Sequence, residues 1–510
     1  MPTFKMAYLP PLLIYASAGV SGLTGIVGIF FIKDFLSLSA AFIASIGFWA
    51  GIPWALKMPV GFLIDRYWNL KQYFVYLGAI LVSISLIIMY GILVHKDQML
   101  LYLDIKIWFI IASILTPIGY VLQDVVADAM TVEVVEPNFK SKLKKVTDIA
   151  IKKEHTLVQL YGRFAIIFGS LLVGLINLFI FKGIDKNYSD INLLYGKIYL
   201  FALIIPAMSV SGIILFNFLN KSITKPVTFK IETLDFQIFL GSCVFVVFTI
   251  SLGTLKIPFS KEIVLCSSLL LISILMRLLI KDLSKKDQYT IVGTAIIIFV
   301  FRAMPGPGPS LNWFEIDILD FNQSFYSLLA VISAVITLIG MLVLKKAMMT
   351  APLSKLFVVL SIFASVFYVP SLCLYYDFHK YTSIITNGII DAKFIAILNT
   401  AVESPLSQVA MIPLLAWIAK NAPTKYKATF FAVFASFTNI ALSARELFTS
   451  YLNKIFIINR EVINKKTYEV LTKANYDSLD NLLVSIMIIT LVVPITTIYL
   501  IQKTKFKSTE

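Results

Sequence analysis

Residues 105–130 read IKIWFIIASILTPIGYVLQDVVADAM, an apolar run that ends with two aspartates four residues apart. A helix of about 20 apolar residues crosses the hydrocarbon core of a bilayer, so this run predicts a membrane span. An Asp at the bilayer centre costs about 2.5 to 3.5 kcal/mol on insertion scales. Asp124 and Asp128 are therefore expected to face the protein interior or a watery path, and not lipid.

The composition of the whole chain agrees with that run. Of 510 residues, 58% are hydrophobic and 14% are charged. Too little polar surface remains to cover a water-soluble body of this size. We therefore predict an all-α polytopic membrane protein.

The charge and the reactive residues exclude several other classes of protein. The formal charge is +15, but the basic residues gather in short loops between apolar runs, so a nucleic-acid partner is not expected. The three cysteines and three histidines lack the spacing of a metal site or a disulfide framework. Phosphate-binding and protease motifs are also missing. We expect no cofactor, no metal and no enzymatic activity.

Apolar runs predict about 14 membrane helices. A first group of six, a middle pair and a second group of six imply two six-helix bundles, at 1–219 and 289–510, with two extra linking helices in 220–288. The predicted helices cover 11–31, 40–64, 73–94, 105–130, 156–182 and 195–219, then 236–254 and 261–280, then 289–305, 324–344, 355–376, 391–419, 428–450 and 481–502.

Loop charges predict the orientation of these helices. If the N-terminus is cytoplasmic, the loops assigned to the inside are richer in Lys and Arg than those assigned to the outside, as the positive-inside rule expects. Both termini are then cytoplasmic. The first apolar run lacks a small-residue cleavage site, so it is expected to act as an uncleaved insertion signal. We expect a monomer in a plasma membrane, the inner membrane of a bacterium.

Asp124 and Asp128 share one face of the predicted helix, one turn apart, and Gln123 lies beside them. Arg163 is at a similar depth in the next helix and is the expected counter-charge. Three roles stay open for this group: a structural clamp between helices, a proton-coupling carboxylate, or a contact to substrate.

A second group of candidates lies at the end of the predicted helix 40–64. Two prolines and two glycines loosen this helix around Lys57. The Lys57 ammonium can attract an anionic substrate, pair with carboxylates of the helix 105–130, or extend to the headgroups. Asp65 and Arg66, in the following loop, are interpreted as a conformational latch.

The second half of the chain offers one mid-span carboxylate. Glu403 precedes Pro405 within the run 391–419, which suits a midplane binding site, a proton carrier or helix-packing contacts equally. Arg445 and Glu446 are expected to neutralise each other in a structural role. The Pro- and Gly-rich stretch 302–323 is interpreted as an ordered external connector.

Four stretches also carry a family resemblance. They are QDVVADA at 123–129, PWALKMPVGFLID at 53–65, MIPLL at 411–415 followed by Pro423 and FFA at 430–432, and RAMPGPGPSLNW at 302–313. Together they resemble the folate-biopterin transporter family of the major facilitator superfamily, over roughly residues 10–450.

That resemblance implies a fold and a function. The fold would be the major facilitator fold, and the activity proton-coupled uptake of folates or pterins by alternating access between two bundles. Lys57 and Arg163 would lie on the substrate side. Asp124, Asp128 and Glu403 would be coupling or gating carboxylates. The alternative is a related permease for another metabolite, such as a muropeptide.

Overall fold

The computed structural model describes most of the chain. The described residues are 5–35, 39–55, 70–140, 148–182, 191–219, 257–281, 283–344, 352–404, 427–463 and 470–507, with short pieces and single positions within 57–64, 240–252 and 406–411. Asp65 and Arg66, the predicted latch, lie outside the described residues, as do most of 236–254 and 404–419.

Long apolar helices dominate this part of the chain. Nine of its helical segments are long and apolar enough to cross a membrane, and a shorter apolar helix covers Ala40–Trp54. Their positions agree closely with the apolar runs of the sequence. The nine segments are Met6–Phe31, Lys71–Val94, Ile105–Asp128, Tyr161–Ile180, Ile191–Leu219, Ser260–Ile280, Gln323–Val343, Leu353–Tyr375 and Leu479–Gln502.

The chain forms two compact units. Unit 1 comprises Met1–Gly28 and Pro59–Phe239, and unit 2 comprises Ile29–Met58 and Leu240–Glu510. One division between them falls within α2 (Gly25–Phe35). A second falls between Met58 and Pro59, so the predicted helix 40–64 is shared between the two units. The predicted boundaries at 219 and 289 stay a prediction.

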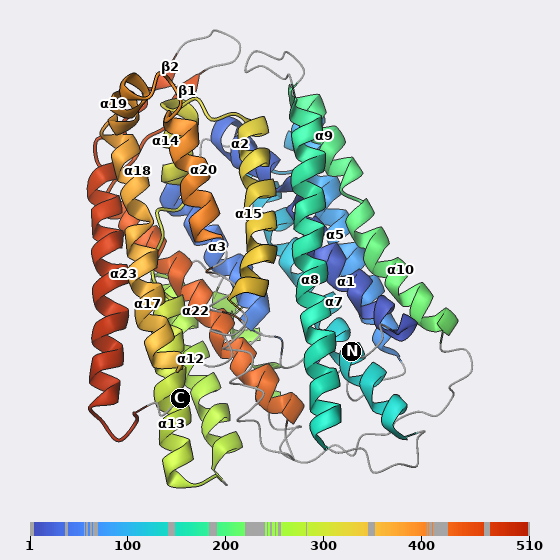
Figure 1. Cartoon of the computed structure of the whole chain (residues 1–510). Coiled ribbons are helices and arrows are strands. Elements are labelled where there is room, and N and C mark those ends of the chain that lie inside the picture. The colour runs from blue at the N-terminus through green and yellow to red at the C-terminus, as the bar shows by residue number, and fades with distance from the viewer. Residues whose placement is uncertain are drawn as a thin grey trace. The chain divides into compact units, whose positions relative to one another are not determined.

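Unit 1 is a bundle of helices that meet at glycines. Its elements are η1 (Met6–Tyr8), α1 (Leu9–Val20), η2 (Ser21–Thr24), α5 (Lys71–Val94), α6 (Lys96–Leu100), α7 (Ile105–Lys140), α8 (Asp148–Phe181), α9 (Ile191–Phe201) and α10 (Ile204–Leu219). Figure 1 shows α5 running beside α7, and α1 beside α8 and α10.

The helices of unit 1 approach closely at two places, where α5 crosses α7 and where α1 crosses α8. A Cβ on Gly78 would lie 2.5 Å from the carbonyl oxygen of Gly119, and a Cβ on Gly119 would lie 2.6 Å from that of Gly78. Gly19 of α1 faces the Ile166 carbonyl of α8 more closely still, and Gly169 faces the Ala16 carbonyl at 2.8 Å. Small residues allow membrane helices to approach closely, and packing then holds them together.

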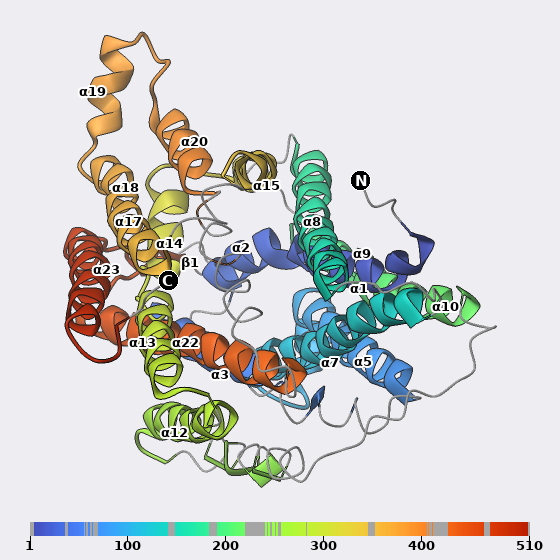
Figure 2. The same ribbon diagram turned by 60° about the horizontal axis from the view of Figure 1, so that its bottom comes forward.

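Unit 2 contains the helices of the second half and α3. Its further elements are α3 (Ala40–Ala55), α12 (Ser260–Ile280), α13 (Lys285–Arg302), α14 (Pro309–Asp317), α15 (Gln323–Val343), α17 (Leu353–Val366), α18 (Tyr368–Tyr375), α19 (Phe378–Ile385), α20 (Ala392–Glu403), α22 (Lys427–Ile455), β1 (Val462–Ile463), β2 (Val470–Thr472) and α23 (Leu479–Gln502). Figure 2 shows α3 along α22, where their contact is extensive, and α17 and α13 near α23.

Three structured segments of unit 2 lie in predicted loops. The stretch 302–323 contains α14, and the loop 377–390 contains α19. The loop 451–480 contains the antiparallel pair β1–β2 and an isolated bridge between Asn459 and Asn475. The stretch 302–323, interpreted as an ordered external connector, contains a helix, and α14 packs its Trp313 and Phe314 into the core of unit 2.

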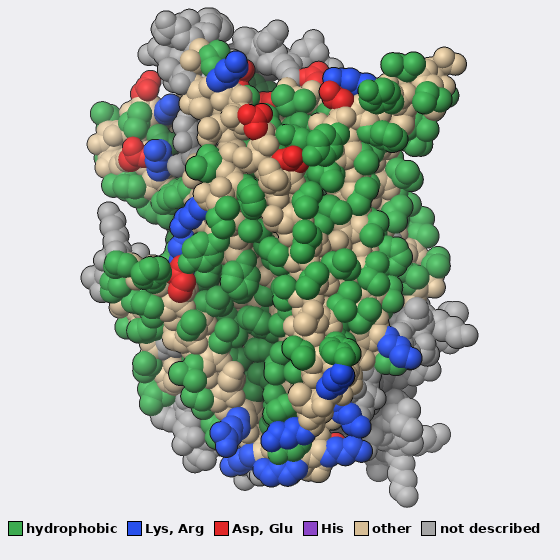
Figure 3. Space-filling model, turned by 90° about the vertical axis from the view of Figure 1, so that its left-hand side faces the viewer, with side chains coloured by type: hydrophobic (Ala, Val, Ile, Leu, Met, Phe, Trp, Pro, Cys, Tyr) green, Lys and Arg blue, Asp and Glu red, His purple; other side chains and the backbone are tan. Residues whose placement is uncertain are grey.

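The surface over α23 is typical of a lipid-facing helix. Val484, Ile488 and Val492 are each at least 40% exposed along its length. Figure 3 shows hydrophobic side chains along this face, with lysines and arginines gathered at its lower end and charges of both signs at its upper end. An exposed apolar band between two polar ends is expected of a multi-pass membrane protein.

Candidate functional sites in the two units

The first candidate site is a group of polar residues inside unit 1. The Tyr15 hydroxyl of α1 donates a 2.5 Å hydrogen bond to Asp128 of α7. Asp124 of α7 and Arg163 of α8 lie close enough to act electrostatically on the same hydroxyl. The structure thus brings Asp124, Asp128 and Arg163 together, around a tyrosine that the sequence reasoning missed.

Local sequence explains how this group fits between three helices. Gly162 lies beside the Tyr15 ring, and a Cβ at that position would meet ring carbons at 2.9 Å. The spacing of four residues places Asp124 and Asp128 on one face of α7. Hydrogen bonds and a nearby opposite charge offset the cost of placing a carboxyl group in an apolar bundle.

Two other predicted binding residues have described contacts elsewhere in their own units. Gln123 is 2% exposed and packs against Gly78, at the crossing of α5 and α7. Lys57 belongs to unit 2, where its ammonium lies over the Trp54 ring at 4.9 Å from the centroid. The Trp54 carbonyl accepts a 3.0 Å hydrogen bond from Asn439 of α22, which places this end of α3 against α22.

The second candidate site is a cluster of charged residues inside unit 2. The Tyr326 hydroxyl of α15 donates a 2.6 Å hydrogen bond to Glu315 of α14. Glu403, at the end of α20, acts electrostatically on Glu315. Arg445 of α22 acts in turn on Glu403 and on Glu446. We call Glu315, Tyr326, Glu403, Arg445 and Glu446 the acidic cluster.

The segment between α13 and α14 holds Glu315 in this cluster. Thr449 of α22 accepts a 3.0 Å hydrogen bond from the Gly306 backbone N–H, and Asn453 binds both the Pro307 carbonyl and the Ser310 hydroxyl. Gly308 has φ +63°, and glycine adopts this left-handed region without steric cost.

Gly306 makes room for Arg445, the positively charged member of the acidic cluster. The Arg445 guanidinium would be 3.0 Å from a Cβ at position 306, so Gly306 leaves the space that this side chain occupies. The Pro-Gly repeat of the sequence therefore forms the turn that presents α14 to α22.

The far end of α14 is anchored by the segment that carries β1 and β2. The Tyr476 hydroxyl donates a hydrogen bond to Asp317, and the Tyr476 ring packs edge-on against Phe314. The Arg460 guanidinium lies over the Trp313 ring at 5.3 Å. These contacts hold the C-terminal half of α14 in place and restrict the position of Glu315.

Burial changes the acidity of Glu315. Burial raises the pKa of this carboxyl from 4.5 to about 7, the hydrogen bond from Tyr326 opposes the rise, and the charge of Glu403 adds to it. Glu403 and Arg445 are exposed, whereas Glu315 and Glu446 are half-buried. The acidic cluster therefore combines a carboxyl whose pKa is raised to about 7 with an exposed arginine.

The helix pair α3–α22 supports the same cluster. Gly47 and Gly51 lie one turn apart on α3, and a Cβ on them would meet Glu446 at 3.0 Å and Ser443 at 2.5 Å. This G-x-x-x-G spacing allows close helix approach in membranes. Glu446 is thus packed against α3, and Arg445 acts on it electrostatically. Their structural role stays a prediction.

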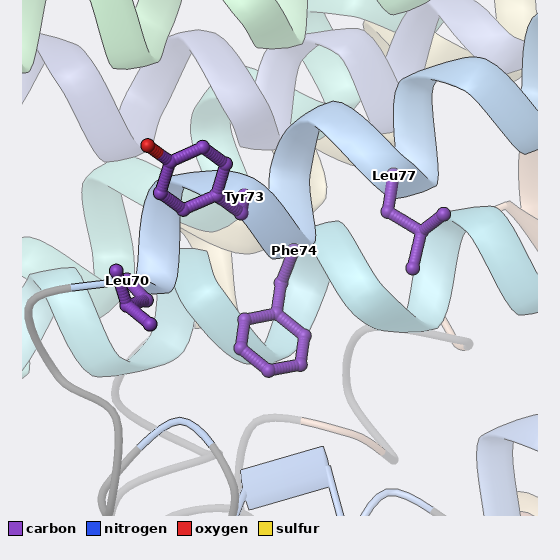
Figure 4. A pocket seen from close by; sticks show the side chains of 4 residues that line it. All are labelled: Leu70, Tyr73, Phe74 and Leu77. Carbon is purple, nitrogen blue, oxygen red and sulfur yellow. The ribbon is translucent and has the colours of Figure 1, made fainter.

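The hollow at the start of α5 does not mark a binding site for a charged solute. It is lined by Leu70, Tyr73, Phe74 and Leu77 and is apolar throughout (Figure 4). Three of these side chains are about half exposed on the surface of the helix. A hollow without polar groups cannot orient a charged solute.

Comparison with known proteins identifies the family. The sequence model of the BT1 family matches residues 197–509, which is more than half of the chain. The chain belongs to the BT1 family. No curated protein sequence matches this BT1-family chain.

Solved structures show the fold. A POT family transporter in complex with a thioalcohol-conjugated peptide is similar with a TM-score of 0.64 and 14% identity, over 98% of this chain and 96% of that one. A POT family transporter in complex with 5-aminolevulinic acid is similar with a TM-score of 0.63 and 14% identity, over 98% of this chain and 96% of that one. The nucleoside transporter NupG is similar with a TM-score of 0.58 and 10% identity, over 97% of this chain and 99% of that one.

These findings confirm one prediction and correct another. The prediction of an all-α polytopic membrane protein with the major facilitator fold is confirmed. The assignment to the folate-biopterin transporter family is corrected: the family shown is the BT1 family, and the fold is shared with peptide and nucleoside transporters.

Proposed function

We propose that this BT1-family protein is a secondary active transporter that accumulates a small zwitterionic metabolite together with protons by alternating access. In this proposal the acidic cluster of unit 2 receives both the solute and the proton. Both termini are cytoplasmic, and the protein works in a plasma membrane.

The observation that carries the proposal is the environment of Glu315. A carboxyl whose pKa is about 7 takes up and releases a proton over a small change of pH. Glu403 acts on this carboxyl and Arg445 acts on Glu403, and these two exposed residues carry opposite charges. A solute with an ammonium group and a carboxylate would complement this pair of opposite charges.

Two kinds of solute fit this chemistry. The first is a peptide-like zwitterion, such as a muropeptide, and peptide-type ligands are bound by some proteins of the same fold. The second is a small amino acid derivative, and a POT family structure holds 5-aminolevulinic acid. Folate, which carries two carboxylates, complements the three glutamates of the acidic cluster less well, and we do not favour it.

The experiment is uptake by proteoliposomes containing the purified full-length chain. Under an inward-directed proton gradient we expect accumulation of a labelled dipeptide, muropeptide or 5-aminolevulinic acid above its external concentration. Folate and a nucleoside complete the panel. Accumulation of folate alone would overturn the zwitterion proposal and leave proton coupling intact.

Unit 1 takes part through Arg163 in this proposal. Arg163→Gln removes the positive charge beside Asp124, Asp128 and Tyr15, so we expect at least about a tenfold loss of uptake, which corresponds to about 1.4 kcal/mol. The measurement is initial uptake between pH 5.5 and 8. A structural clamp would lower the melting temperature together with uptake, whereas a coupling role would alter the pH profile at an unchanged melting temperature.

If Arg163→Gln has the same uptake and the same pH profile as the wild type, Arg163 takes no part in transport. Arg277→Gln is the matched control, because Arg277 lies in the last turn of α12 and takes no part in either candidate site. It should retain wild-type uptake at every pH.

A further inference from the structure

One end of unit 2 carries a dense group of lysines. They come from three places in the sequence: the turn between α12 and α13, the start of α17, and the segment after α23. All seven are exposed: Lys281, Lys285, Lys286, Lys355, Lys503, Lys505 and Lys507. Figure 3 shows lysines and arginines gathered at the lower end of this face, below the apolar band. We call these seven residues the basic end.

The fold holds these lysines together. The chain turns back after α23, and Phe506 packs its ring edge-on against Tyr289 of α13, with centroids 5.2 Å apart. The Phe506 carbonyl lies against Gly293, where a Cβ could not be accommodated. The Lys505 ammonium lies over the Tyr289 ring at 4.9 Å. This return places Lys503, Lys505 and Lys507 beside the start of α13.

The nearest described carboxylate is already engaged. Ser284 caps α13: its hydroxyl accepts a hydrogen bond from the Asp287 backbone N–H and donates one of 2.6 Å to the Asp287 carboxylate. This exchange resembles a capping box and satisfies the acid locally. Among the described residues at this end of unit 2, the seven lysines therefore have one carboxylate nearby, Asp287, and Ser284 already binds it.

The position of the basic end favours a lipid headgroup over a free anion. It borders the exposed apolar side chains of α23, and the rings of Tyr289, Tyr499 and Phe506 lie among the lysines. Aromatic side chains are enriched where hydrocarbon meets water. Clustered lysines directly beside a membrane helix attract anionic lipids.

We infer that the basic end is a binding site for anionic phospholipid headgroups of the phosphatidylglycerol type. The lipid phosphate binds among the lysines of α13 and of the segment after α23, and the acyl chains lie along the apolar surface of α23. The site is separate from the acidic cluster and does not depend on the transported solute.

The test uses the delipidated full-length protein in detergent. It is titrated with phosphatidylglycerol or with phosphatidylcholine, and bound lipid is counted by native mass spectrometry. We expect the wild type to bind phosphatidylglycerol more tightly than phosphatidylcholine. In K503Q/K505Q/K507Q the affinity for phosphatidylglycerol should fall by about tenfold or more. The matched control K96Q/K106Q/K182Q removes three exposed lysines of unit 1 and should bind phosphatidylglycerol like the wild type.

A second variant tests the fold of the site. Gly293→Val displaces the returning segment and should weaken phosphatidylglycerol binding while all seven lysines remain. Equal binding of both lipids by the wild type would overturn the inference, as would equal losses in the two triple variants. Complete displacement of the lipid by inorganic phosphate would also overturn it, because the site would then be one for a free anion.

Discussion

Glu315→Gln abolishes accumulation driven by a proton gradient and leaves exchange of labelled for unlabelled solute intact. The amide has nearly the shape of the protonated acid and can keep a hydrogen bond with Tyr326, but it cannot release a proton. The carrier should therefore bind and reorient with solute, without coupling to the gradient. The measurement is the ratio of gradient-driven uptake to counterflow in the same proteoliposomes.

The pH profile follows from the same carboxyl. Burial disfavours the charged form, so Glu315 is mostly protonated below its pKa of about 7 and mostly ionised above it. Wild-type uptake should fall as the external pH rises through about 7, and counterflow by Glu315→Gln should be flat over that range.

Glu461→Gln serves as the control for Glu315→Gln. Glu461 is an exposed carboxyl of the loop 451–480, and its removal should leave uptake and the pH profile unchanged. Gradient-driven accumulation that survives in Glu315→Gln would place the coupling proton elsewhere.

Gly19→Val prevents unit 1 from folding normally. A side chain at position 19 would overlap the Ile166 carbonyl of α8, and that backbone cannot move without separating α1 from α8. Overpacking costs about 1 to 3 kcal/mol in well-packed cores, and a backbone obstacle should place this substitution at or above the upper end. The measurement is the yield of monodisperse protein and its melting temperature in detergent.

Gly25→Val is the matched control for this substitution. Gly25 lies six residues further along and is exposed, and among the described residues no neighbouring atom lies within 4 Å of the position that a Cβ would take there. The variant should express and melt like the wild type. Equal stability of the two variants would contradict the close crossing of α1 and α8.

The sequence predicts most of the described helices and part of one candidate site. Apolar runs of spanning length depend only on local composition, so segments such as 73–94 correspond closely to α5 (Lys71–Val94). Asp128 and Arg163 were found because an ionised residue in an apolar run is costly wherever it lies. Their tyrosine partner was missed, since tyrosine is common in membrane helices and nothing local marks Tyr15.

The acidic cluster could be predicted only in part. Glu403 stands within an apolar run, but Glu315 lies in a polar, Pro-rich stretch where a carboxylate attracts no attention. Its burial depends on Asn453 and Thr449 of α22 and on Tyr476. These contacts join segments more than 130 residues apart, which local patterns do not report. One signal was available: Trp313 and Phe314 precede Glu315 and suggest a buried helix.

The most direct test of the central claim is the uptake of labelled zwitterionic solute by wild-type proteoliposomes, with and without an imposed inward proton gradient. Proton-coupled transport predicts accumulation above the external concentration with the gradient, and only equilibration when a protonophore collapses it. Identical uptake in the two conditions, for every solute of the panel that is transported, would contradict the account.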